Sequence, residues 1–208
     1  MAPIDSTALR LTGQLKELDD LQPAGTWLLR VSDGLRVVPI AEHVLMREVP
    51  ATVTQANVLT LLRVLAGTLE NFGLRKPRIA VAGLNPHAMG PEDREQIAPA
   101  VEQARAQGID AQGPVSPDAV FRQCIEGKHD AVVSMYHDQG QIAVKTAVFE
   151  GACSIYIGLP YVHLSIPHGS AYDIAGKGIA QHKSMLAAMR TAANLAAGRG
   201  FDLNGARA

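Results

Sequence analysis

The sequence predicts an α/β fold with an open, mostly parallel sheet flanked by helices. Apolar runs that resemble strands alternate with amphipathic segments that resemble helices, which is typical of parallel strands joined by crossover helices. The chain has 208 residues, 47% of them hydrophobic, and a slightly positive mean hydropathy, so it can bury a sizeable core. We therefore expect a single α/β unit over residues 1–208.

The first elements are two strands and a long helix. The strands are expected at Trp27–Val31 and Leu35–Ile40, around a turn at residues 32–34. A helix follows over Gln55–Asn71, with Thr54 as its N-cap, because apolar residues recur there at helical spacing. Its expected buried face consists of Val58, Leu61, Leu62, Leu65 and Leu69.

The second half continues the alternation. Strands are expected at Arg78–Ala82, Ala131–Met135 and Ala152–Ile157. Helices are expected from Pro91 to just before Gly108, from Ser116 to about Glu126, and from Ser184 to Ala197. In the last helix, the apolar residues predicted to face the core are Met185, Leu186, Met189 and Leu195.

Composition narrows the possible functions. A formal net charge of −1 with interspersed signs gives no basic surface for nucleic acid or an anionic membrane, so small-molecule chemistry is favoured. Cys124 and Cys153 are too few for a disulfide framework and suit a reducing compartment. The first residues do not resemble a signal peptide, and no run of about 18 apolar residues appears. We expect a cytoplasmic protein.

Three histidines follow strand-like segments. His43, His87 and His137 each lie shortly after an apolar run, and residues at the carboxyl ends of strands in open α/β sheets line the ligand site. Imidazole suits divalent transition metals, and three such ligands leave coordination positions open for a substrate. Their separation is far longer than in a local zinc motif, so each could instead be structural or solvated. His129 and His182, in polar stretches, are expected to be solvated.

A loop near the carboxyl terminus is rich in small residues. Residues 168–180 contain several glycines together with His168 and Asp173, and a carboxylate there could accept hydrogen bonds from the two hydroxyls of a ribose. A surface turn before the last helix is the alternative interpretation. The G-x-G-x-x-G fingerprint is absent, so Rossmann-type dinucleotide binding is not expected.

Several blocks of sequence occur in a specific order from about Val31 to the last helix. They are Val31-Ser32-Asp33-Gly34-Leu35-Arg36-Val37-Val38, Gly83-Leu84-Asn85-Pro86-His87-Ala88, Met135-Tyr136-His137-Asp138-Gln139-Gly140, Lys145, Gly158-Leu159-Pro160, His168-Gly169-Ser170-Ala171 and Asp173-Ile174-Ala175-Gly176. Together they resemble the 4-hydroxythreonine-4-phosphate dehydrogenase family of pyridoxine (vitamin B6) biosynthesis and its relatives.

The resemblance implies a fold and a domain organisation. The fold would be like that of isopropylmalate and isocitrate dehydrogenases, lacking part of the N-terminal domain. The chain would correspond to the C-terminal two-thirds of the family. Within it, residues 1–30 would be an atypical N-terminal segment, residues 31–182 a metal- and NAD-binding core, and residues 183–208 a C-terminal helix and tail.

The resemblance also implies the site residues. The divalent-metal ligands would be His43, His87 and His137, one of them contributed across a homodimer interface, with zinc as the first choice and magnesium, manganese or cobalt as alternatives. Residues implied to bind NAD are His168, Asp173 and Gly176. Lys145 and Asp138 would be catalytic, and the substrate contacts would be Lys145, Ser154 and His163.

The implied reaction is NAD-dependent oxidation of a hydroxy acid followed by decarboxylation. Ser154 and His163 stand where the phosphate-specific members have asparagine and arginine, and imidazole does not reproduce the arginine fork. The substrate is therefore either phosphorylated hydroxythreonine or a non-phosphorylated dihydrodiol carboxylate. A truncated metal-binding dimer with little or no catalysis is the alternative from another class, and acyl or phosphoryl transfer ranks last.

Overall fold

The computed structural model describes residues 25–32, 34–147, 151–166, 168–169 and 171–201. Most of the expected N-terminal segment (residues 1–24 of 1–30) and the end of the expected tail (202–208) lie outside the described residues. Asp33 and Ser170, which belong to two of the quoted blocks, also lie outside them.

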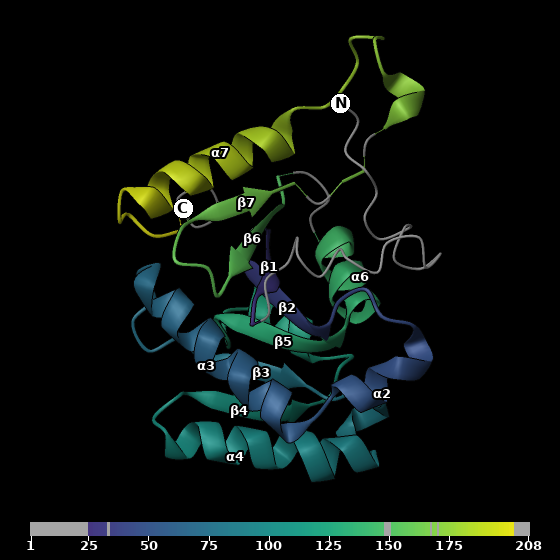
Figure 1. The fold of residues 1–208 in the computed structure, drawn as a ribbon, viewed down its shortest axis with the longest axis vertical. Coiled ribbons are helices and arrows are strands. Elements are labelled where there is room, and N and C mark those ends of the chain that lie inside the picture. Colours follow the sequence, from purple (N-terminus) through teal and green to yellow (C-terminus); the bar gives the residue numbers. More distant parts are fainter. Residues whose placement is uncertain (1–24, 33, 148–150, 167, 170, 202–208) are drawn as a thin grey trace.

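The described residues form a seven-stranded sheet with the order β4-β3-β5-β2-β1-β6-β7 (Figure 1). The strands are β1 (Trp27–Ser32), β2 (Leu35–Ala41), β3 (Ile79–Ala82), β4 (Ala111–Val115), β5 (Ala131–Tyr136), β6 (Cys153–Ile157) and β7 (His163–Ser165). Strands β4, β3, β5 and β2 are parallel, whereas β1 is antiparallel to both β2 and β6, and β7 is antiparallel to β6. Five of the seven strands thus run in one direction, which confirms the mostly parallel sheet.

Helices cover both faces of this sheet (Figure 1). They are α2 (Val49–Thr52), α3 (Gln55–Asn71), α4 (Ala98–Ala106), α5 (Val120–Ile125), α6 (His137–Ala147) and α7 (Lys183–Ala196), with short 3-10 helices at Met46–Glu48, Pro86–Ala88 and Tyr172–Ile174 and a π-helical turn at Asp93–Ile97. Side chains alternate between the two faces along each strand. On β5, Val133 packs in the core beneath α3 and α4, and Val132 packs with α5 and α6.

Helix α3 has the bounds that the sequence predicts. The Thr54 side chain accepts a hydrogen bond from the Asn57 amide at 3.2 Å, which satisfies one of the free donors at the helix start. All five predicted apolar residues on its inner face are fully buried. Burial of each such leucine stabilises the fold by about 1.5–3 kcal/mol.

Other elements differ from expectation. Strands β4 and β7 were not predicted, because β4 contains Gly113-Pro114 and β7 has only three residues at the sheet edge. The predicted inner face of α7 is wrong in part: Met189 is 63% exposed, and only Leu195 of the four predicted residues is buried. The helix packs on β6 and β7 through small residues such as Ser184 and Ala188 instead.

In the described part of the chain, no single helix is long and apolar enough to cross a membrane. The helical segments Met46–Thr52 and Gln55–Asn71 pass such a test only when counted together, and they are bent by 80° at the break between them.

His129 is buried rather than solvated, which corrects the expectation from its polar neighbours. Only 4% of the residue is exposed, and its Nε2 lies 3.3 Å from the Gln123 Oε1 atom. Burial, together with the positive charges of Lys128 and Arg78, lowers the pKa of His129. The folded protein therefore favours the neutral imidazole.

This burial predicts a pH dependence of stability. Because the folded pKa of His129 is below the unfolded value of about 6.5, the unfolded state binds the proton more readily. The stabilisation is present above that value and is lost as the pH falls towards the folded pKa. We expect urea unfolding to show a smaller loss of stability from about pH 7.5 to about pH 5.5 in His129→Gln than in the unmodified chain. The exposed His182→Gln is the matched control, and an unchanged pH dependence in His129→Gln would contradict this account.

Candidate active site

Two of the three predicted metal ligands lie side by side. Strands β2 and β5 are parallel neighbours, and Ala41 is paired with Tyr136 in their register. The chain leaves both strands at the same edge, so His43 and His137 emerge next to each other. Their ring centroids are 5.1 Å apart. Neighbouring parallel strands are therefore the structural cause of this imidazole pair.

A carboxylate completes the cluster. One potential ligand atom from each of Glu42, His43 and His137 lies within 4.8 Å of the others. All three residues are partly buried. Imidazole nitrogens and a carboxylate oxygen are donors that suit zinc, manganese or cobalt, so these residues fit a divalent metal. Sequence reasoning missed Glu42, although it directly precedes His43 at the end of β2.

His87 lies outside this cluster within the single chain. It follows β3 in the 3-10 helix Pro86–Ala88, and its backbone is left-handed, with φ 55° and ψ 17°. The next residue, Ala88, also has a positive φ of 57°. Such a conformation costs about 1–3 kcal/mol per non-glycine residue and persists only where the surroundings impose it. The loop is therefore held in an unusual conformation at the position of the predicted ligand.

Asp93 imposes that conformation. Its carboxylate is fully buried and accepts hydrogen bonds from the backbone amides of Leu84 (2.7 Å), Asn85 (3.3 Å) and Gly90 (2.8 Å). The Asn85 side-chain amide donates a fourth hydrogen bond at 3.0 Å. The sequence suggested only an acidic residue in the first turn of a helix. Asp93 instead fastens both ends of the loop that presents His87.

Helix α6 contributes three further polar residues. The Asp138 carboxylate lies 2.9 Å from Nδ1 of His137; with a proton on Nδ1, the imidazole donates to Asp138 and leaves the Nε2 lone pair free. Gln139 ties the start of α6 to the β3 loop: its oxygen accepts from the Met135 amide at 2.7 Å, and its nitrogen donates to the Gly83 carbonyl at 3.0 Å. Lys145 is exposed two turns further along the helix.

The three residues predicted to bind NAD, His168, Asp173 and Gly176, are exposed. His168 Nδ1 lies 3.1 Å from the Gly169 carbonyl oxygen, and Asp173 lies in the short 3-10 helix Tyr172–Ile174. Gly176 has a φ of +76°, a conformation that glycine adopts without strain. The loop thus offers one imidazole and one carboxylate to solvent.

The predicted substrate contacts occupy different environments. Ser154 is 4% exposed in β6, where it is paired with Arg30 on β1 and with Ser165 on β7. His163 is exposed on β7, and its ring centroid lies 4.4 Å from that of Tyr156 and 6.4 Å from that of Tyr161. The three rings form an aromatic group around the edge strand.

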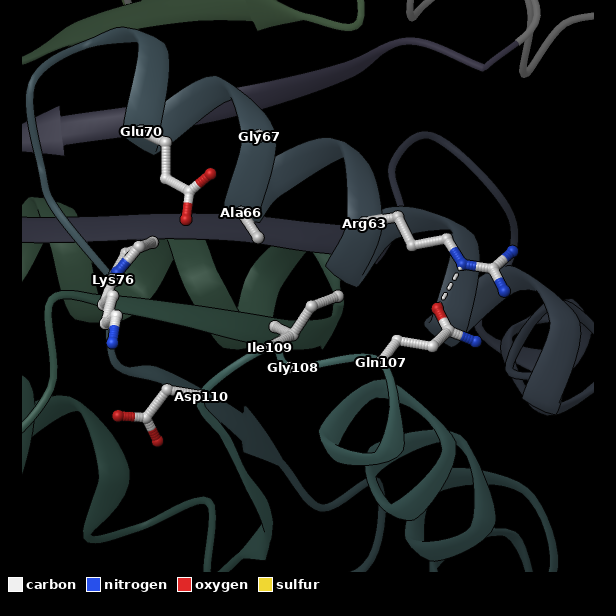
Figure 2. A pocket seen from close by; sticks show the side chains of 10 residues that line it. Arg63, Ala66, Gly67, Glu70, Lys76, Gln107, Gly108, Ile109 and Asp110 are labelled. Atoms are coloured by element: carbon white, nitrogen blue, oxygen red, sulfur yellow. Dashed lines mark hydrogen bonds between the residues drawn. The ribbon is translucent and has the colours of Figure 1, made fainter.

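A cavity of about 360 Å³ lies away from these residues. Figure 2 shows it between the second half of α3 and the turn after α4. Its polar lining includes Glu70, Lys76 and Asp110, and Arg63 donates to Gln107 at 2.8 Å. It lies before the amino ends of β3 and β4, whereas His43 and His137 follow the carboxyl ends of β2 and β5. We therefore separate this cavity from the candidate active site.

The chain is an α/β protein in which a cluster of potential metal ligands, Glu42, His43 and His137, lies at the carboxyl ends of parallel strands. Residues 2–192 match the family described as pyridoxal phosphate biosynthetic protein PdxA, and the chain belongs to this family. A relative from Novosphingobium aromaticivorans is 48% identical over 202 residues, which cover 97% of this chain and 61% of the relative.

Solved structures agree with this membership. The 4-hydroxythreonine-4-phosphate dehydrogenase of Klebsiella pneumoniae is similar with a TM-score of 0.77 and 38% identity, covering 91% of this chain and 61% of that one. A terephthalate 1,2-cis-dihydrodiol dehydrogenase from Burkholderia xenovorans LB400 has a TM-score of 0.67 and 31% identity, covering 82% and 56%. The chain thus spans about three-fifths of the length of the relatives it matches.

The role of Asp93 predicts a large effect of its removal. Asp93→Ala leaves several partly buried donors unpaired around a strained loop, and we expect the free energy of unfolding to fall by about 3 kcal/mol in urea titrations. Hydrogen exchange at the Leu84 and Gly90 amides should accelerate more than elsewhere. Glu95→Ala, an exposed position on the same helical segment, is the control. A loss no larger than that of the control would contradict the role of Asp93.

Proposed function

We propose that the chain belongs to a metal- and NAD-dependent dehydrogenase that oxidises and decarboxylates a hydroxy acid, as a 4-hydroxythreonine-4-phosphate dehydrogenase does. The observation that carries this proposal is the cluster of Glu42, His43 and His137 at the carboxyl edge of parallel strands in a PdxA family member. The similarity to the Klebsiella pneumoniae dehydrogenase supports the same reaction class.

The histidines bind the metal in this proposal. His43 and His137 act from one subunit, and His87, which is outside their cluster, acts from the second subunit of a homodimer. Zinc is the first choice, with magnesium, manganese and cobalt as alternatives. When bound, such an ion polarises the substrate oxygen atoms and stabilises the negative charge that develops on them. Asp138 holds the His137 ring and its Nδ1 proton in place.

The exposed loop binds NAD in this proposal. His168 contacts the adenine, Asp173 accepts from the ribose hydroxyls, and Gly176 lets the backbone approach the nucleotide. When bound, NAD accepts the hydride that leaves the alcohol carbon. Lys145 neutralises the substrate carboxylate or donates the proton that replaces carbon dioxide. Ser154 and His163 contact the substrate in this proposal.

A dihydrodiol carboxylate is the second candidate substrate. His163 occupies the position at which the resemblance places a phosphate-binding arginine, and it lies in an aromatic group with Tyr156 and Tyr161. Aromatic and imidazole rings favour contact with an unsaturated carbon ring over contact with a phosphate group. Similarity to the Burkholderia xenovorans dihydrodiol dehydrogenase points the same way. A metal-binding dimer without catalysis is the alternative from another class.

We place this activity in the cytoplasm. Cys124 and Cys153 are both free and buried, and burial raises the pKa of each thiol. Unpaired thiols of this kind suit a reducing compartment, where the dinucleotide substrate is also found.

The proposal predicts metal-dependent formation of NADH. With zinc, manganese or cobalt added, the full chain should reduce NAD in the presence of phosphorylated hydroxythreonine or of a cyclic dihydrodiol carboxylate. The absorbance of the NADH formed measures the rate. His137→Ala should lower the rate by at least about a hundredfold, because it removes an inferred metal ligand. His182→Ala, an exposed position at the start of α7, is the matched control. A chain that binds metal yet reduces no NAD with either substrate would favour the non-catalytic alternative.

A further inference from the structure

We propose that Glu42 is a metal ligand, so that one subunit by itself forms a metal site of two imidazoles and one carboxylate. This inference rests on the metal dependence in the proposed function and goes beyond it in naming the ligand set. His87 of a second subunit would then complete the site rather than create it. Glu42 lies beside His43 and is paired with the buried Arg30, which connects β1 and α6 to the site.

The position of Glu42 suits ligation. It is the first residue after β2 and directly precedes His43, and its side chain is only 8% exposed. Ligand atoms that share an ion at about 2.0–2.2 Å lie about 3–4 Å from one another. The three potential ligand atoms here lie within 4.8 Å of each other, so modest side-chain movement would bring them onto one ion. Two histidines and one carboxylate are a common set for a divalent metal with open positions.

Arg30 holds the Glu42 carboxylate in a fixed plane. The Arg30 guanidinium donates to both carboxylate oxygens, through Nη1 to Oε1 and through Nη2 to Oε2 at 2.9 Å. Nη1 also donates to the Leu28 carbonyl at 2.9 Å. A carboxylate has about four lone-pair positions, and a bidentate arginine uses two of them. Each oxygen of Glu42 therefore keeps one lone pair for another partner.

Arg30 also connects the elements that present the two histidines. It lies in the middle of β1, which is paired with β2, and its side chain reaches the end of β2. With its amide oxygen turned toward Arg30, Gln141 accepts from Nε at 2.8 Å and from Nη2 at 3.3 Å. Gln141 lies on α6, the helix that begins with His137. Arg30 is thus a positioning residue for both sides of the metal site.

The ion pair also sets the charge of the site. A lone buried carboxylate would be costly, and Arg30 compensates it whether or not a metal is present. With the pair neutral overall, a bound divalent ion would retain its positive charge towards the open side. That charge suits an anionic hydroxy acid, which is the substrate class of the proposed function.

Cobalt binding tests the inference directly. The full chain would be titrated with Co²⁺ while its visible absorption, which reports the ligand set, is recorded. Glu42→Gln should weaken binding by at least about tenfold and change the spectrum, because a neutral amide replaces a charged ligand. His87→Ala should retain binding within about threefold at dilute protein. The control is Glu48→Gln, which alters an exposed carboxylate near the same segment.

A second variant protects the test against misfolding. Glu42→Gln leaves Arg30 buried without its charge partner, so the double variant Arg30→Met/Glu42→Gln removes both charges at once. If this variant and Glu42→Gln, in which Arg30 is still present to contact Gln141, both keep the far-ultraviolet circular dichroism of the parent and bind cobalt weakly, the lost carboxylate is responsible. Unchanged affinity and spectrum in Glu42→Gln, or in the folded double variant, would overturn the inference.

The outcomes separate this inference from the proposed function. If Glu42→Gln loses cobalt but the parent chain forms no NADH, the ligand assignment stands and the proposed activity fails. If the parent forms NADH with metal while Glu42→Gln binds cobalt normally, the activity stands and the ligand assignment fails.

Discussion

The candidate site depends on one constraint, the parallel pairing of β2 with β5. This pairing places Ala41 opposite Tyr136, and the residues that follow, Glu42-His43 and His137, therefore emerge together although they are far apart in the sequence. The two strands are held from both faces of the sheet by buried apolar residues, such as Val38 and Val133 on one side and Val37 and Val132 on the other. The core behind this edge fixes the backbone of the polar cluster. Ordering its side chains therefore costs little additional conformational entropy.

Around this edge, buried and partly buried polar groups connect the loops and helices. Asp93 fastens the loop of His87, Gln139 links that loop to the start of α6, and Arg30 ties Glu42 to β1 and α6. Each of these groups has well-defined partners, and each would be costly if a partner were removed. The left-handed backbone of His87 costs free energy, which the contacts that hold this loop in place offset. Such strain often occurs at functional loops.

Local sequence patterns predicted much of the fold. The bounds of α3 follow from helical spacing and from the cap at Thr54, and the strands that precede the histidines are short apolar runs. Local patterns did not predict the roles of residues whose contacts are distant in the sequence. Glu42 and Asp93 look like ordinary acidic residues until the fold brings Arg30 and the loop amides to them. Helix α6, whose first turn is polar, was not predicted from the sequence. The apolar residues predicted on the inner face of α7 are mostly exposed, because this helix packs through small residues.

We propose that the His43 and His137 rings bind one ion at the edge of the sheet. The most direct measurement is a crystal structure of the full chain soaked with zinc, with the ion located by its anomalous scattering. We expect a single strong peak with an imidazole nitrogen of each ring at about 2.0–2.1 Å. A zinc ion bound elsewhere, or at only one of the two rings while the other points away, would contradict it.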